Sequence, residues 1–265
     1  MSVADAFAKS RAEQRAALVG YLPAGFPDVP GAVDAMRVMV EAGCDAIEVG
    51  LPYSDPVMDG PTIQAAAQQA LEGGVRTRDV LRTVEAVAAS GVPALVMTYW
   101  NPVERYGVER FAADLAGAGG AGLITPDLVP EEAGEWVAAA DRHGLDKVFL
   151  VAPSSTDARL ELTVRSCRGF VYATAVMGVT GARENSSTLA APLVERTRRF
   201  TDLPIGVGIG VSNGEQAAEV AGYADAVIVG SAFVRRLLDA GADRTRGLDS
   251  LIALTRELAD GVRRG

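Results

Sequence analysis

The stretch "PIGVGIGVSNGEQAAEVAGYADAVIVGSAFV", Pro204–Val234, places two short apolar runs on either side of a helix-like segment. The runs Ile205–Val207 and Ala226–Val229 have the length and the Val/Ile content of buried strands. Between them, the Ala- and Glu-rich segment Gln216–Ala221 predicts a helix. A strand, a helix and a second strand in this order indicate a βαβ unit, whose two strands run parallel.

The same alternation of strand and helix extends along the rest of the chain. Six more apolar runs predict strands at Ala17–Tyr21, Ala46–Val49, Ala94–Thr98, Ala121–Ile124, Lys147–Val151 and Phe170–Ala173. Segments with helical spacing follow at Val33–Ala42, Val80–Ser90, Phe111–Ala118, Glu131–Arg142, Asp157–Ser166, Leu189–Phe200 and Leu248–Val262. The chain therefore reads as eight strand–helix units.

Eight such units form either a doubly wound sheet or a closed barrel. We expect the barrel, because eight parallel strands close around an interior that side chains can fill, and 265 residues is an ordinary length for it. The Gly- and Pro-rich stretches are brief and no segment has low complexity, which predicts a single α/β domain, a (β/α)8 TIM barrel over residues 1–265. An extra N-terminal helix is expected near Ala4–Gln14, and a short helix after the eighth strand.

Charge and cysteine content exclude several classes of function. The chain carries 25 basic and 34 acidic residues, a formal charge of −9, which argues against nucleic acid or anionic membrane as a partner. No run approaches the ~18 apolar residues of a membrane span, and the N-terminus lacks the apolar region of a signal peptide. The two cysteines, Cys44 and Cys167, are far apart, so we expect a reduced, cytoplasmic protein.

Glu48 is the first candidate for chemistry. Side chains alternate along "AIEVG", so that Ile47 and Val49 face the helices while Ala46 and Glu48 point into the barrel, close to the end where such barrels have their active sites. A desolvated carboxyl has a raised pKa, which suits proton transfer, but a structural ion pair with an arginine is an equally good interpretation. For Asp59 in "MDGP", a turn-capping role is favoured from the residues alone.

A second candidate site is formed by glycines at the predicted ends of the last two strands. Gly210 and Gly230 allow backbone N–H groups to approach an anion, and Ser231 occupies a position like a helix N-cap. Barrels often bind phosphate between these two loops and a short helix, although the glycines could simply permit tight turns. A dinucleotide fingerprint fits poorly, because Asn213 stands where the third glycine of GxGxxG belongs.

The scarcity of histidine and lysine narrows the chemistry. His143 is the only histidine and is predicted at the opposite end of the barrel, so neither a histidine metal site nor a histidine base is expected. Lys9 and Lys147 are also predicted away from the strand ends, which leaves no candidate for an imine. The polar residues expected at the strand ends are Glu48, Asp59, Tyr99, Asn101, Asp127, Tyr172 and Thr180. They suit proton transfer on a substrate that carries its own electron sink.

Eight segments of the chain resemble the α subunit family of tryptophan synthase. They are "ALVGYLPAGFP", "IEVGLPYSDPVMDGPTIQ", "MTYWNPV", "DLVPEE", "LVAPSSTDAR", "GFVYATAVMGVTGAR", "PIGVGIGVSN" and "VIVGSAFV". The resemblance implies a lyase that splits indole-3-glycerol phosphate into indole and glyceraldehyde 3-phosphate, in which the indole ring is the electron sink. It also implies a tryptophan synthase β subunit as partner in an α2β2 assembly, with pyridoxal phosphate in that partner and no cofactor or metal in this chain.

The resemblance also assigns roles to individual residues. It implies that Glu48 protonates the indole ring carbon and takes the proton of the glycerol hydroxyl, and that Asp59 accepts a hydrogen bond from the indole N–H. Tyr172 would support the glutamate, and Thr180 would belong to a loop that closes over substrate. The remaining matches are phosphate-binding Gly181, Gly210, Gly230 and Ser231, indole-surrounding Tyr99, Leu51 and Phe26, and partner-facing Asp55, Pro56, Asn101 and Asp127.

Two alternatives from other classes stay open at this point. One is another phosphate-binding barrel enzyme, either a sugar-phosphate isomerase or a free-standing indole-releasing lyase. The isomerase is disfavoured because histidine and lysine are missing from the predicted strand ends. The other is a regulatory subunit that binds a phosphate ligand without catalysis, which would not need both Glu48 and Asp59.

Overall fold

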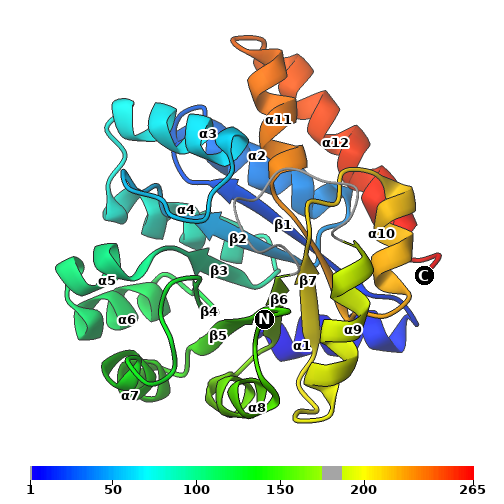
Figure 1. Cartoon of the computed structure of the whole chain (residues 1–265). Helices are drawn as coiled ribbons and strands as arrows, with labels where there is room; N and C mark the ends of the chain where they lie inside the picture. Colours follow the sequence, from blue (N-terminus) through cyan, green and yellow to red (C-terminus); the bar gives the residue numbers. More distant parts are fainter. Residues whose placement is uncertain (1, 175–186) are drawn as a thin grey trace.

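Eight parallel strands close into a barrel in the computed structural model, which describes residues 2–174 and 187–265 (Figure 1). Pairing of Ala17 in the first strand with Ala226 in the last closes the ring and excludes the doubly wound alternative. All eight predicted strands are confirmed, with ends that shift by two residues at most. They are β1 (Ala17–Pro23), β2 (Ala46–Gly50), β3 (Ala94–Met97), β4 (Gly122–Thr125), β5 (Asp146–Val151), β6 (Val171–Thr174), β7 (Ile205–Gly208) and β8 (Ala226–Val229).

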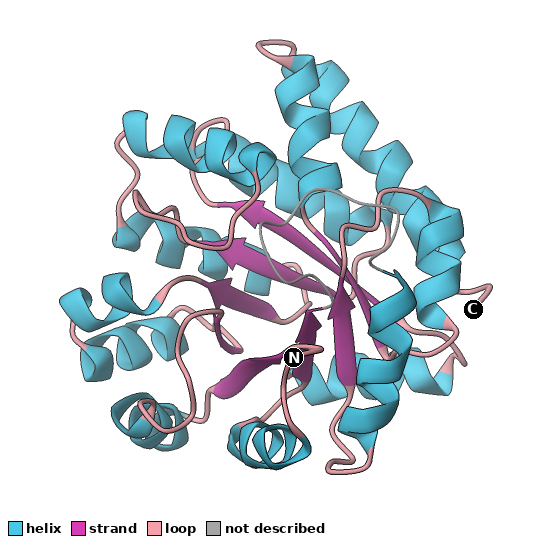
Figure 2. Cartoon of the chain, viewed as in Figure 1, coloured by secondary structure: helices cyan, strands magenta, loops and turns pink. Residues whose placement is uncertain are grey.

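Helices surround the barrel on its outside (Figure 2). Those that follow the predictions are α1 (Val3–Ala12), α2 (Val29–Ala42), α4 (Thr77–Ala88), α6 (Val108–Gly117), α7 (Gly134–His143), α8 (Asp157–Ser166), α9 (Ser187–Arg198), α10 (Gly214–Ala221), α11 (Ser231–Ala240) and α12 (Arg244–Gly261). Among the helices described, none has the length and apolar character that crossing a membrane requires.

Two helices were not predicted, and both lie in loops at the C-terminal ends of strands. The first, α3 (Pro61–Glu72), starts with proline at its first position, where the missing N–H costs nothing, and continues with strong helix formers. The second, α5 (Trp100–Tyr106), has only seven residues and carries Pro102 in its first turn. Both helices have a proline in their first turn, which hid the helical pattern.

The barrel interior is filled by small and branched side chains from alternate strand positions. These inward residues form one buried cluster that includes Ala17, Val19, Ala46, Leu95, Ile124, Val148, Phe170, Ala226 and Ile228. Val3 and Phe7 of α1 join this cluster, and the Phe7 ring stacks on Phe170 with 5.5 Å between centroids. Helix α1 therefore covers the N-terminal end of the barrel, and the polar chemistry lies at the other end.

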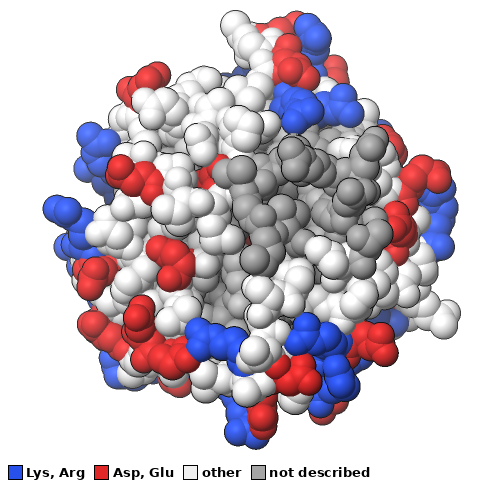
Figure 3. All heavy atoms as spheres, in the orientation of Figure 1, with Lys and Arg blue, Asp and Glu red and all other residues white. Residues whose placement is uncertain are grey.

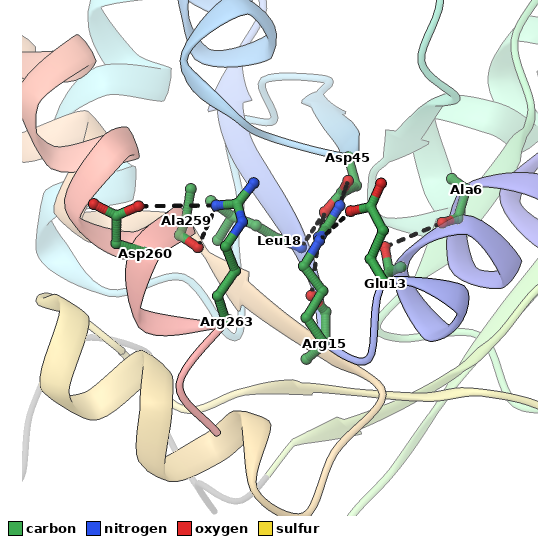
Figure 4. A network of polar contacts seen from close by, with 10 residues as sticks. Ala6, Glu13, Arg15, Leu18, Asp45, Ala259, Asp260 and Arg263 are labelled. Atoms are coloured by element: carbon green, nitrogen blue, oxygen red, sulfur yellow. Dashed lines mark hydrogen bonds and ion pairs between the residues drawn. The ribbon is translucent and has the colours of Figure 1, made fainter.

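A buried ion pair ties the starts of β1 and β2 together at this lower end (Figure 4). The guanidinium of Arg15 donates to both carboxylate oxygens of Asp45, at 2.6 and 2.7 Å, and to Glu13 at 2.7 Å. Asp45 also accepts from the backbone N–H of Leu18 at 2.8 Å. The Arg15 and Asp45 side chains are 5% and 11% exposed, so the removal of one leaves the other as an uncompensated buried charge.

We predict that Arg15→Ala lowers the free energy of unfolding by roughly 3 kcal/mol, because it strands the Asp45 carboxylate. The matched control is Arg263→Ala. Arg263 is half exposed and lies 4.0 Å from Asp260, so its loss should cost less than about 1 kcal/mol. Urea unfolding of both variants gives the comparison. Equal effects would show that the Arg15–Asp45 pair does not anchor the two strands.

Candidate active site

Glu48 lies inside the barrel, as alternation along β2 predicts. Ala46 belongs to the interior cluster, whereas Ile47 and Val49 pack in the outer core between the strands and the helices. The Glu48 side chain is therefore directed inward, and the residue is 1% exposed. Its partner in the β1–β2 register is Tyr21, which stands at the same level of the barrel.

The Glu48 carboxyl is buried without compensation. Within the described residues, neither of its oxygens has a hydrogen-bond partner, and no arginine or lysine forms an ion pair with it. Burial disfavours the charged form and raises the Glu48 pKa from about 4.5 to about 8. The structural ion-pair interpretation thus finds no support in the described part of the chain, and the carboxyl is mostly protonated at neutral pH.

Asp59 is the second carboxylate at this end of the barrel. Burial raises its pKa, and a hydrogen bond from the Tyr99 hydroxyl opposes this rise. The same hydroxyl accepts from the Met58 N–H at 3.0 Å, which fixes the segment before α3. The N-cap of α3 is Gly60, so Asp59 does not cap this helix. The carboxylate is instead held by a tyrosine that is 5% exposed.

Two tyrosines line the mouth of the barrel beside Glu48. Tyr172 on β6 lies above Phe170, with 6.3 Å between ring centroids, and its hydroxyl occupies the space that a side chain at Gly208 would fill. Tyr21 on β1 was not among the predicted site residues, although alternation from Ala17 and Val19 along the same strand would have placed it inward. Burial raises the pKa of both tyrosines well above the ordinary value, so both remain hydrogen-bond donors.

Of the residues expected around an indole, Tyr99 stands beside Asp59 and Leu51 is partly buried at the end of β2. Phe26 is 2% exposed and packs in the outer core, which leaves little of its ring for a ligand.

The glycine cluster sits at neighbouring strand ends, as predicted. Residues of β7 and β8 pair in register from Gly206 and Ala226, which brings Gly210 and Gly230 to the same edge of the barrel. Gly210 has a φ of 84°, which favours glycine. One detail was wrong: Gly230 is the N-cap of α11, and Ser231 is the first residue of the helix. Because Gly230 has no Cβ, the Tyr21 ring can pack against the backbone there.

Two predicted residues, Thr180 and Gly181, lie outside the described residues. Their proposed roles remain predictions.

The partner-facing residues predicted by resemblance lie on three adjacent loops that hydrogen bonds join. The Asn101 side chain donates to the Tyr53 hydroxyl at 3.0 Å, and the Trp100 N–H donates to Asp127 at 2.9 Å. Asp55 and Pro56 lie on the loop after β2, next to Val57, whose side chain is 72% exposed. On the face shown in Figure 3, basic and acidic side chains are interspersed around the periphery.

The residues that could support other chemistry lie elsewhere. His143 ends α7 and contacts Glu109 at 2.8 Å, and Lys147 donates to Asp141 at 2.6 Å, so both are at the predicted positions away from the barrel mouth. Burial raises the Cys167 pKa to about 12 and that of Cys44 higher still, which leaves both as thiols. In the described ranges, no three His, Cys, Asp or Glu side chains group as a metal site.

Comparison with known proteins identifies the family. A family model for the tryptophan synthase alpha chain matches residues 7–263. The chain belongs to this family. The tryptophan synthase alpha chain of Acidothermus cellulolyticus is 63% identical over 263 residues, which cover 99% of this chain and 97% of that protein. That of Salinispora arenicola is 66% identical over 258 residues, 97% and 96% of the two chains.

A solved structure of tryptophan synthase from Mycobacterium tuberculosis has the same fold. The two chains are 59% identical and superpose with a TM-score of 0.92 over 99% of this chain and 98% of the other. The family resemblance drawn from the eight motifs is therefore confirmed, as is the barrel.

The Glu48 pKa makes a prediction about stability. Its folded value, about 8, exceeds the ordinary 4.5, so the stability it contributes is complete below about pH 4.5 and is lost as pH rises towards 8. Glu48→Gln removes the ionisable group. Its free energy of unfolding should therefore rise relative to that of the parent chain as pH increases, by on the order of 3–5 kcal/mol at about pH 9.

Denaturant unfolding of the two proteins between about pH 4 and pH 9 measures this difference. Glu109→Gln is the control, because the exposed Glu109 pairs with Arg142 and its pKa is lowered to about 2. That variant should show no gain as pH rises. A constant offset between Glu48→Gln and the parent chain would contradict the buried neutral carboxyl.

Proposed function

We propose that this chain cleaves indole-3-glycerol phosphate to indole and glyceraldehyde 3-phosphate, the α reaction of tryptophan synthase and a carbon–carbon lyase reaction. The observation that supports it most is the Glu48 carboxyl, which has no partner in the described part of the chain and is buried inside the barrel with a pKa raised to about 8. Such a group gives up and regains a proton near neutral pH, which a retro-aldol cleavage requires. Membership of the tryptophan synthase alpha chain family indicates which substrate undergoes this cleavage.

In the proposed mechanism, Glu48 first acts as an acid. Its proton goes to the indole ring carbon that bears the glycerol chain, and the ring becomes positively charged at its nitrogen. The resulting Glu48 carboxylate then takes the proton of the glycerol hydroxyl. As the O–H bond breaks, a carbonyl forms, the carbon–carbon bond cleaves, and its electron pair returns to the indole ring. Glu48 ends the cycle protonated, as it began.

Asp59 stabilises the charge that develops on the ring. A carboxylate that accepts from the indole N–H becomes a better partner as that nitrogen turns positive, so the interaction strengthens in the transition state. The Tyr99 hydroxyl, which donates to Asp59, favours the charged form of the carboxyl and so opposes the rise in its pKa that burial causes. The two carboxyls thus have different roles: Glu48 donates and accepts protons, and Asp59 stabilises the positive charge on the indole ring.

The phosphate of the substrate would bind at the ends of β7 and β8. Gly210 and Gly230 leave the backbone accessible there, and α11 begins at Ser231 with its first N–H groups and the positive end of its dipole. The Ser231 hydroxyl would add a donor. Gly181, from the part of the chain outside the described residues, would contribute a further backbone contact.

The loops after β2, β3 and β4, which carry Asp55, Pro56, Asn101 and Asp127, form a face that suits a partner protein. Val57 and Val129 expose apolar side chains on the loops that carry Asp55, Pro56 and Asp127, and the hydrogen bond from Asn101 to Tyr53 links the neighbouring loop. We propose this face as the contact with a tryptophan synthase β subunit, which would hold pyridoxal phosphate and receive the indole in an α2β2 assembly. This chain would need no cofactor of its own for the proton transfers.

Replacement of the carboxyls tests the mechanism. Glu48→Gln should lower indole release from indole-3-glycerol phosphate by at least ~10²-fold, because the amide cannot exchange a proton. Asp59→Asn should lower kcat by roughly 10²-fold through lost charge stabilisation. Glu109→Gln, the same change on the outside of the barrel, serves as the control. Undiminished turnover of Glu48→Gln would overturn its assignment, and a normal rate for Asp59→Asn would remove that residue from the mechanism.

The phosphate site is tested by calorimetry with glycerol 3-phosphate. Ser231→Glu places a negative charge at the start of α11 and should weaken binding at least ~10-fold by repulsion. Ser90→Glu, in the exposed turn after α4, carries the same change at a distance and should bind normally. Equal affinities for the two variants would show that phosphate binds elsewhere.

The assay with and without added β subunit separates the alternatives. A lyase subunit releases indole slowly alone and faster with its partner, while a free-standing lyase is fast without it. A regulatory subunit releases none. Glu48 and Asp59 both lie at the same mouth of the barrel, which favours the two lyase alternatives over the regulatory subunit.

A further inference from the structure

Tyr21 occupies a position at the barrel mouth that neither the motifs nor the proposed mechanism assigns. It is the inward residue of β1 that pairs with Glu48 in the register of β1 and β2. Glycines stand on both neighbouring strands where its ring passes. A Cβ at Gly230 on one side would lie 3.1 Å from the Tyr21 Cδ1 atom, and a Cβ at Gly50 on the other would lie 2.5 Å from its hydroxyl oxygen.

These contacts define how the Tyr21 side chain lies. The ring starts beside the end of β8 and crosses towards β2, so that its hydroxyl stands over Gly50. Gly50 is the next inward position after Glu48 on the same strand. The hydroxyl is therefore held on the Glu48 side of the mouth, one layer above the carboxyl, and any side chain at Gly50 would displace it.

The other polar groups around Glu48 have contacts of their own. Asp59, on the loop after β2, accepts from the Tyr99 hydroxyl, which follows β3. Tyr172 on β6 directs its hydroxyl to Gly208 on β7. Glu48 itself has no hydrogen-bond partner among the described residues. Tyr21, Tyr172, Asp59 and Tyr99 are the titratable groups that act on one another and on Glu48 across this mouth, and none of them is a cation.

We propose that Tyr21 is a positioning residue whose hydroxyl donates a hydrogen bond to the Glu48 carboxylate once that group has given its proton to substrate. The inference rests on the proposed acid–base role of Glu48. In the resting state Glu48 is a neutral acid and needs no such donor. After proton transfer it is a buried anion with no cation beside it among the described residues, and the Tyr21 hydroxyl, held between two glycines on its side of the mouth, is a donor placed to compensate it.

The hydrogen bond has a definite effect on pH dependence. A donor to the charged form lowers the pKa of the carboxyl that it serves. Tyr21→Phe removes the donor, so the Glu48 pKa should rise. Because the reaction starts from protonated Glu48, activity falls as pH rises through that pKa, and the basic limb of the kcat profile should move to higher pH in the variant. The maximum rate should fall, since the carboxylate intermediate loses its donor.

The test compares kcat and KM for indole release by the full chain at a series of pH values. For Tyr21→Phe we expect kcat to fall about 10-fold or more, the basic limb to shift upward by about one pH unit and KM to change less than about 3-fold. Tyr223→Phe is the matched control. It removes a buried tyrosine hydroxyl that has no hydrogen-bond partner among the described residues, between α10 and β8 and away from the mouth, and should leave the profile unchanged.

The outcomes separate this inference from the proposed function. A lower kcat with an unshifted basic limb, or a raised KM with normal kcat, would show that the Tyr21 ring merely lines the substrate site and would overturn the inference. If Glu48→Gln abolishes turnover and Tyr21→Phe has no effect, only the inference fails. If Glu48→Gln keeps full turnover, the proposed function fails first.

Discussion

The burial of one carboxyl inside the barrel is the constraint around which this barrel mouth is organised. A β-strand directs alternate side chains to opposite faces, and in a closed barrel one of those faces is a packed interior. Once Ile47 and Val49 are required by the outer core, Glu48 must point inward, where burial raises its pKa to about 8. The free-energy cost of this burial is offset by stabilising contacts elsewhere in the fold. These include the bidentate Arg15–Asp45 ion pair and the apolar packing of α1 over the N-terminal end of the barrel.

The side chains around that carboxyl follow from its environment. Large aromatic rings from β1 and β6 line the mouth, and the strand ends beside them carry Gly50, Gly208 and Gly230. A Cβ at Gly50 or Gly208 would collide with a tyrosine, and one at Gly230 would crowd the Tyr21 ring. The same absence of side chains that admits the rings leaves backbone accessible for a phosphate at β7 and β8. Packing and the proposed phosphate binding therefore involve the same glycine, Gly230, and a substitution there is expected to affect both.

Most of the scaffold could be predicted from the sequence because its signal is local. Apolar runs of three to five residues indicated each strand, and parity along Ala46–Val49 was enough to place Glu48. The residues alone did not decide whether Glu48 is catalytic or forms a structural ion pair, because the side chains around it come from strands distant in sequence. Asp59 looked like a turn residue for the same reason: its partner, Tyr99, is 40 positions away. Helices α3 and α5 were hidden by prolines, and Tyr21 was overlooked although the same parity rule applied to β1.

The central claim, a Glu48 carboxyl that stays protonated at neutral pH, can be measured directly by infrared difference spectroscopy. The spectrum of the parent chain minus that of Glu48→Gln isolates the carbonyl stretch of this protonated acid, which disappears when it ionises. The account predicts a titration midpoint near pH 8. A midpoint near the ordinary value of about 4.5, or no protonated band at neutral pH, would contradict it.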